Sequence, residues 1–176
     1  EIADFWSMLQ GFQTSGKCIE KAHYRIRYMK SFRPLSVKED IEFKEARPIL
    51  YLNTAAVASL FNSRNAGSTS NRSNWSTIMS YLKSHASYLG LKQDRFTILL
   101  PSGLPDYTID IVNGEQVKKV KVNRPKALCF DYLQLKETFG LDLETEVVAE
   151  VQDMKEVLSD KSDSQPSVPV QQDLSF

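Results

Sequence analysis

Residues 74–89 read NWSTIMSYLKSHASYL, and this stretch decides the fold class that we expect. Its apolar side chains recur at the spacing of one helix face. They are Trp75, Ile78, Met79, Leu82, Ala86 and Leu89. Asn74 or Ser73 can cap the helix, and Ser80 and Lys83 lie on its outer face, where small hydroxyls and one lysine allow close approach to a sugar–phosphate surface. The pattern predicts a helix over 74–88, although the same residue types are also ordinary on a helix surface.

Downstream, residues 106–122 read DYTIDIVNGEQVKKVKV and predict a β-hairpin. Asn113-Gly114 is typical of a two-residue type I′ turn between two strands, here 106–112 and 116–122. Alternation about this turn places five apolar side chains on one face, namely Tyr107, Ile109, Ile111, Val120 and Val122. Thr108, Lys119 and Lys121 fall on the other face. We expect a hairpin that is apolar inside and basic outside.

Working outward, the remaining pattern predicts a mixture of short helices and strands. Helices are expected over 2–14, 54–61, 131–139 and 143–158, and strands over 23–30, 40–43, 48–52, 95–100 and 126–130. The strand from His23 alternates apolar residues with Arg25, Arg27 and Lys30, which indicates a basic exposed face.

Helix, strand, helix, polar turn, helix and basic hairpin follow one another in the order of a winged-helix unit. The sequence therefore predicts an α+β, winged-helix-like domain over 1–158, with the helix at 74–88 as recognition helix and the hairpin as wing. Residues 159–176 are rich in Ser, Pro, Gln and Asp and predict a flexible tail. An α+β fold without DNA-binding function fits the same order of elements.

The net charge of zero conceals an uneven distribution. Residues 1–140 contain 20 basic and 13 acidic side chains, a net charge of +7, whereas residues 141–176 contain 2 and 9, a net charge of −7. A basic body with an acidic tail is typical of nucleic-acid-binding proteins. A solvated surface with a self-screening tail fits the charges equally well.

The polar segment 62–74 adds two arginines and no acidic residue. Together with the strand, the helix and the hairpin, it completes a set of candidate nucleic-acid contacts. These are Arg25, Arg27, Lys30, Arg64, Arg72, Ser80, Lys83, Lys119 and Lys121.

The sequence offers no catalytic centre, no metal site and no cofactor motif. Cys18 and Cys129 are far apart, lack zinc-ligand spacing and are expected to be reduced and buried. Residues 11–18, GFQTSGKC, nearly match a P-loop, but Cys18 supplies no hydroxyl for Mg²⁺ and the segment follows a helix instead of a strand. His23 and His85 flank basic or hydroxyl-rich segments, which favours a surface or phosphate-facing role over base catalysis. Because the sequence has no signal peptide and no long apolar stretch, we expect a cytoplasmic protein.

Three phrases, ILYLNTAAVASLF, YLKSHASYLGLKQDRF and ALCFDYLQL, resemble the carboxy-terminal accessory region of primase–helicase replication proteins of bacterial mobile elements. The resemblance covers about 49–133. It implies a non-catalytic module attached to a replication enzyme whose motor or polymerase chemistry lies upstream of Glu1. The matching positions are Tyr81, Leu82, Lys83, Tyr88, Leu89, Gly90, Arg95, Phe96, Phe130, Asp131 and Tyr132.

The last six residues, QQDLSF, resemble the Q-x-x-L-x-F peptides that bind the bacterial sliding clamp. Gln171, Leu174 and Phe176 match the anchor positions, and an extended linker would present them. A chance match at a flexible end is the simpler alternative. We therefore expect DNA as the main partner and no small-molecule substrate, with a protein-interaction domain that uses its basic face and carboxy-terminal peptide as the alternative function.

Overall fold

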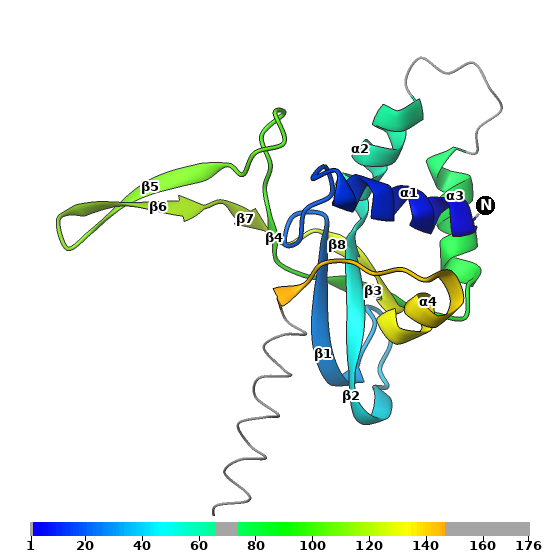
Figure 1. The fold of residues 1–176 in the computed structure, drawn as a ribbon. Helices are drawn as coiled ribbons and strands as arrows, with labels where there is room; N and C mark the ends of the chain where they lie inside the picture. Colours follow the sequence, from blue (N-terminus) through cyan, green and yellow to red (C-terminus); the bar gives the residue numbers. More distant parts are fainter. Residues whose placement is uncertain (1, 66–73, 147–176) are drawn as a thin grey trace, which may run out of the picture. The chain divides into compact units, whose positions relative to one another are not determined.

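The structure, a computed structural model, describes residues 2–65 and 74–146 (Figure 1). Residues Glu1–Glu144 form one compact unit, which contains all the elements discussed here. The predicted helix from Val147 onward, the tail and its terminal peptide lie outside the described residues, as does Arg72. The α+β class expected from the sequence is confirmed.

The unit contains four helices and a principal four-stranded sheet. The helices are α1 (Ile2–Thr14), α2 (Thr54–Asn65), α3 (Trp75–Ser84) and α4 (Tyr132–Phe139). The sheet has the order β1-β2-β8-β3, from β1 (Tyr24–Phe32), β2 (Ile41–Asn53), β8 (Lys126–Asp131) and β3 (Tyr88–Gln93), and all its pairs are antiparallel. The shorter strands are β4 (Phe96–Thr97), β5 (Tyr107–Val112), β6 (Glu115–Val120) and β7 (Val122–Asn123).

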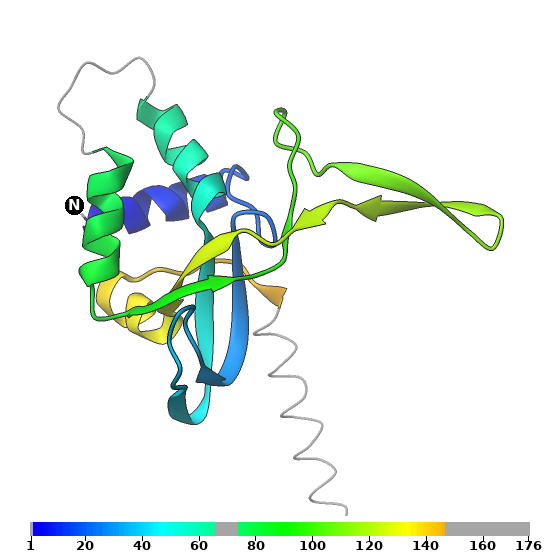
Figure 2. The ribbon, with the colours of Figure 1, turned by 180° about the vertical axis from the view of Figure 1, so that it is seen from behind.

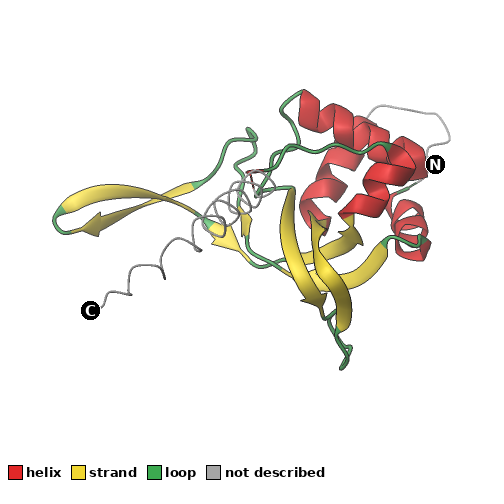
Figure 3. Ribbon diagram, turned by 60° about the horizontal axis from the view of Figure 1, so that its bottom comes forward, coloured by secondary structure: helices red, strands yellow, loops and turns green. Residues whose placement is uncertain are grey.

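All four helices cover one face of the principal sheet, and Figure 3 shows them gathered on that side. Alternate strand residues such as Ile26, Leu52 and Phe130 point into this core, where they meet the fully buried Leu9 and Leu82. The opposite face holds a smaller core, which consists of Phe32, Ile49, Tyr51, Phe96, Ala127 and Cys129. The strict alternation of inward and outward residues explains how one sheet supports two apolar layers.

Predicted helix ends are confirmed where a cap residue marks them. Asn74 accepts a hydrogen bond from the Thr77 N–H at 2.9 Å and begins α3, and Asp131 begins α4 in the same way through Gln134. Gly140, with φ of +68°, ends α4 in the left-handed conformation that glycine adopts without steric cost. Helix α2 begins at Thr54, but the capping side chain is Asn53, whose Oδ1 accepts from the Ala56 N–H, where the sequence suggested Thr54 as cap.

The predicted helix over 74–88 is too long, since α3 ends at Ser84. His85 adopts an extended backbone, and its Nδ1 accepts a hydrogen bond from the Ser87 N–H at 3.1 Å, a local contact that competes with the helix. From Tyr88 the chain becomes β3 and pairs with β8. Leu89, which continues the apolar periodicity past the helix, packs against the smaller core, whereas Ile78 and Leu82 of α3 lie in the larger one.

Two short strands predicted at 40–43 and 48–52 are one continuous strand, β2. Pairing with β1 extends through Pro48, which lies opposite Tyr28. Only β1 flanks β2 at this point, because pairing with β8 begins at Ile49, and a proline is tolerated at such an edge. The strand predicted at 95–100 is reduced to β4, which pairs only with β7.

His23 is buried, contrary to the surface role expected from its neighbours. Its side chain is 5% exposed, and its Nδ1 accepts a hydrogen bond from the Ile19 N–H at 3.0 Å. Burial lowers the pKa of this imidazole. Cys18 and Cys129 are buried free thiols, as predicted, and burial raises both pKa values, that of Cys18 to about 12.

Candidate nucleic-acid interface

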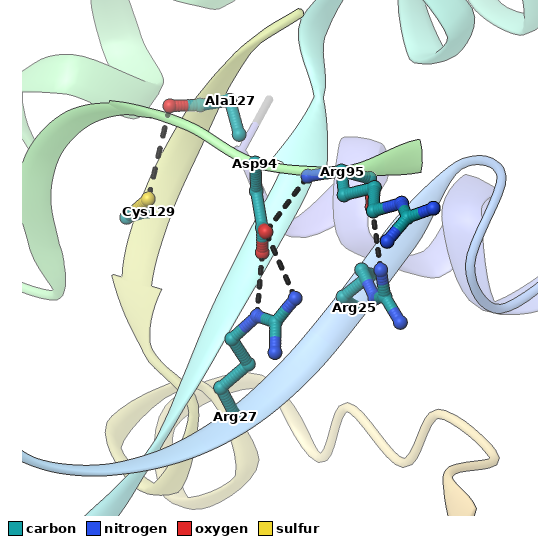
Figure 4. A network of polar contacts seen from close by, with 6 residues as sticks. All are labelled: Arg25, Arg27, Asp94, Arg95, Ala127 and Cys129. Carbon is teal, nitrogen blue, oxygen red and sulfur yellow. Dashed lines mark hydrogen bonds and ion pairs between the residues drawn. The ribbon is translucent and has the colours of Figure 1, made fainter. Parts of the chain in front are cut away.

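Arg27 on β1 is held by Asp94, which follows β3. Two parallel hydrogen bonds join them, from Nε to Oδ2 at 2.6 Å and from Nη2 to Oδ1 at 2.8 Å (Figure 4). The Asp94 side chain is only 12% exposed and also accepts from the Arg95 N–H at 2.7 Å. The paired carboxylate raises the pKa of Arg27. Arg27, which the sequence placed on a solvated basic face, is therefore already engaged within the protein.

Arg25 lies beside this pair and donates from Nη1 to the Arg95 carbonyl oxygen at 2.6 Å. Partial burial, and then the neighbouring Arg27, lower the pKa of Arg25. Asp94 and Glu20 are the carboxylates that act on it in the opposite direction. Arg25, Arg27, Asp94 and Arg95 are called the arginine cluster below. The Arg27 guanidinium pairs with Asp94, and the Arg95 backbone joins this pair to Arg25 through its N–H and its carbonyl.

The arginine cluster lies where the hairpin joins the principal sheet. The Asp94 N–H donates to the Pro125 carbonyl at 3.3 Å, and two residues further on β4 pairs with β7. The Ile98 N–H continues this junction by donating to the Lys121 carbonyl at 2.9 Å. Backbone hydrogen bonds thus fix the root of the hairpin beside the cluster.

Strands β5 and β6 and their turn, residues 107–120, form an arm that reaches away from the sheet (Figures 1 and 2). The predicted turn is confirmed, because Asn113 and Gly114 both have positive φ, +52° and +82°. The predicted burial of one face is wrong, since every residue of both strands is exposed. Ile109 and Ile111 are 65% and 74% exposed. The predicted division of residues between the two faces is confirmed, but the arm projects beyond the core that was expected to cover one of them.

The two faces of the arm differ in charge. Residues directly opposite each other share a face, and the register pairs Tyr107 with Val120, Ile109 with Lys118 and Ile111 with Gln116. This face has no acidic residue. The other face carries Thr108, Asp110, Val112, Glu115, Val117 and Lys119. A polyanion therefore meets less repulsion on the first face, which we call the acid-free face.

The arm lysines predicted from the sequence are exposed but paired. Lys119 Nζ lies 3.3 Å from Asp110, and Lys121 Nζ lies 3.2 Å from Asp106. Lys118, which the sequence analysis did not select, lies over the Tyr107 ring at 4.9 Å. Exposed ion pairs contribute about 0–1 kcal/mol, so phosphate groups can compete for these ammonium groups.

Helix α3 lies at the other end of the unit from the arm, and Figures 1, 2 and 3 agree on this separation. Lys83 is exposed in its last turn, and the Ser80 hydroxyl donates back to the Ser76 carbonyl at 3.1 Å. The structure thus brings Arg25 and Arg27 to the root of the arm, while Ser80 and Lys83 stay apart from Lys119 and Lys121. Lys30 is exposed near the β1 bulge, and Arg64 is exposed in the last turn of α2.

Sequence reasoning missed Asp94 and Arg95 as members of this interface. A useful signal was present: Lys92-Gln93-Asp94-Arg95 sets a lone carboxylate among cations, and Arg25-x-Arg27 places two guanidinium groups on the same strand face. Only the contact between β1 and the end of β3, far apart in sequence, reveals that these groups meet.

Within residues 2–65 and 74–146, no three His, Cys, Asp or Glu side chains gather as a metal site would require. No helix in the described ranges has the length and apolar character needed to cross a bilayer. Comparison with family models, characterised proteins and solved structures gave no match to the chain.

Proposed function

We propose that the chain is a non-catalytic nucleic-acid-binding module that binds duplex DNA through the hairpin arm and the arginine cluster. The observation that carries the proposal is an arm exposed on both faces and rooted beside three guanidinium groups. A two-stranded ribbon can enter a groove of B-DNA, and flanking cations supply phosphate contacts. A protruding ribbon with only a structural role would be expected to bury one face.

A winged-helix-like arrangement is part of this proposal. The order α1, β2, α2, α3, β3, hairpin and β8 follows that of a winged-helix unit, with β1 as an added edge strand and the arm as wing. Contacts of α3 with α1 and α2 support a three-helix core. Helix α3 is remote from the arm. We therefore expect the arm to contribute more of the binding free energy, and α3 to add a separate contact through Lys83.

Electrostatics set the expected strength of binding. Residues 1–140 have a net charge of +7, and about five phosphate contacts give micromolar binding with a slope of log K against log salt of roughly −4 to −5. Cations available at the arm and its root include Arg25, Arg95, Lys118, Lys119 and Lys121.

We place this module in a replication protein of a bacterial mobile element, acting in the cytoplasm. The proposal rests on the resemblance of 49–133 to accessory regions of primase–helicases and on the basic body. The terminal peptide with Gln171, Leu174 and Phe176 would add a sliding clamp as second partner.

A protein-interaction domain is the second candidate function. The exposed apolar residues of the arm favour it, because contiguous apolar surface often marks a protein interface. In that case the basic face would meet an acidic protein, and DNA would bind weakly or not at all.

Fluorescence anisotropy of a labelled duplex at about 50 mM salt tests the proposal. The double charge reversal Lys119→Glu/Lys121→Glu should weaken binding at least about tenfold, because it turns two phosphate contacts into repulsions. The matched control is Lys38→Glu/Lys44→Glu, which reverses two exposed lysines in and before β2 and should change affinity far less. No binding by the unaltered chain would reject the proposed function, and equal effects of the two reversals would reject the arm as its site.

A further inference from the structure

The tip of the arm exposes more apolar surface than a solvated hairpin needs. Ile111 is 74% exposed and Ile109 65%, and Ile111 lies two residues before the Asn113-Gly114 turn. An isolated two-stranded hairpin is only marginally stable in water. Large aliphatic side chains at such a tip are therefore expected to have a partner.

We propose that Ile111 inserts as a wedge between base steps of duplex DNA and bends it. This inference rests on the proposed DNA-binding function and names the kind of contact that the tip makes. Apolar side chains that enter the minor groove partly unstack neighbouring bases and kink the duplex by about 20–90°. The unstacking costs a few kcal/mol, which wider contact with the bent DNA offsets.

Ile111 lies nearer the tip of the arm than Lys118 and Lys119, as a wedge requires. Lys118 and Lys119 lie opposite Ile109 and Thr108, four to five positions behind the turn. At about 3.3 Å per residue, this places the lysines roughly 13–16 Å from the tip, whereas the minor groove is about 7.5 Å deep. With the tip inside the groove, the ammonium groups therefore remain outside it, at the level of the sugar–phosphate backbones.

Charge decides which face of the arm meets the nucleic acid. Ile109 and Ile111 share the acid-free face with Gln116 and Lys118, while Asp110 and Glu115 point to the other side. Lys118 is already positioned over the Tyr107 ring on this face. A polyanion is complementary to the acid-free face and to the arginine cluster at its root, and this complementarity favours DNA over an apolar protein surface as the occupant.

The experiment uses the full chain and duplexes of equal length that carry 2-aminopurine at a central step and a dye pair at the ends. Ile111→Thr removes the apolar wedge but keeps a β-branched residue, so the strand preference of the arm is retained. Leu104→Thr is the matched control, because Leu104 is 65% exposed and lies before β5.

Binding of the unaltered chain should raise 2-aminopurine emission and bring the dyes closer, more strongly at a flexible TA step than in an A-tract. Ile111→Thr should lose at least about half of both signals while affinity falls no more than about tenfold and the salt slope is unchanged. Leu104→Thr should behave as the unaltered chain.

Two results would overturn the wedge. Binding without unstacking or bending, or signals that Ile111→Thr leaves intact, would remove the wedge and leave DNA binding in place. A chain that shows no DNA binding but self-associates through Ile111 in sedimentation would overturn both the wedge and the proposed function, and would assign the tip to a protein contact.

Discussion

Arg27 and Asp94 are 67 residues apart in sequence, yet their side chains are joined by two hydrogen bonds of 2.6 and 2.8 Å. This pair ties β1 to the segment that leads into the hairpin. The guanidinium groups of Arg25, Arg27 and Arg95 outnumber the carboxylates of Asp94 and Glu20 that act on Arg25, so the root of the arm keeps an excess of positive charge.

Asp94→Asn should lower stability and strengthen DNA binding at the same time. The amide keeps the shape but loses the charged acceptor of Arg27, whose side chain is 40% exposed, so we expect a loss of about 1–2 kcal/mol in unfolding free energy. Release of the Arg27 charge should raise DNA affinity about two- to fivefold. Urea denaturation and anisotropy measure the two effects, and a fall in both stability and affinity would contradict the assigned role of Asp94.

Gly90→Ala should be strongly destabilising. Gly90 has φ of +134°, and an added Cβ would lie 2.6 Å from the Pro34 Cβ, so we expect a loss of at least about 2 kcal/mol. Gly11→Ala is the matched control. It lies in α1 with open space around it and should stabilise the fold by about 0.5–1 kcal/mol. Equal unfolding midpoints for the two variants would be inconsistent with the packing of Pro34 on β3.

The stability of the fold should decline on mild acidification because of His23. Burial lowers the pKa of this side chain from its ordinary 6.5, so the unfolded state binds a proton first as the pH falls. Stability from this group is therefore complete above about pH 6.5 and is lost as the pH falls toward the lowered folded pKa. His23→Asn, which retains an acceptor for the Ile19 N–H, should flatten this decline in urea titrations between about pH 7.5 and 5. If stability fell equally steeply with pH in both proteins, the decline would be due to groups other than His23.

Removal of residues 147–176 should strengthen DNA binding. This segment has 2 basic and 6 acidic residues, a net charge of −4, so we expect it to compete with DNA for the basic body. The cut spares Leu141 and Leu143, which are buried in the core. The gain should be greatest at low salt, where screening is weak. Identical affinities of the full and shortened chains at low salt would leave the acidic segment without an autoinhibitory role.

Local signals in the sequence predicted where helices and turns begin and end better than which residues are buried. Asn74, Asp131 and the Asn113-Gly114 turn mark element ends through their own side chains or backbone, and all three predictions are confirmed. Whether the hairpin and His23 are buried depends on which distant elements pack against them. Alternation shows that one face of a strand is apolar, but it does not reveal whether a core lies against that face.

The candidate site was predictable only in part for the same reason. Arg25 and Arg27 were identified from strand alternation, whereas Asp94 and Arg95 belong to the site through tertiary contact alone. Sequence order suggested one interface for α3 and the hairpin. The sheet instead separates them, because β3 carries the chain from the end of α3 across to the root of the arm.

The salt dependence of DNA binding tests the central claim most directly. For the unaltered chain, log K should fall against log salt with a slope of roughly −4 to −5. In the double variant Arg25→Ala/Arg95→Ala the slope should become shallower by about 1.8, that is, about 0.9 for each lost phosphate contact. Lys83→Ala, at the far end of the unit, should change it by no more than about 0.9. An unchanged slope in the arginine double variant, or binding that does not respond to salt, would contradict the assignment of the arm and its arginine cluster as a nucleic-acid interface.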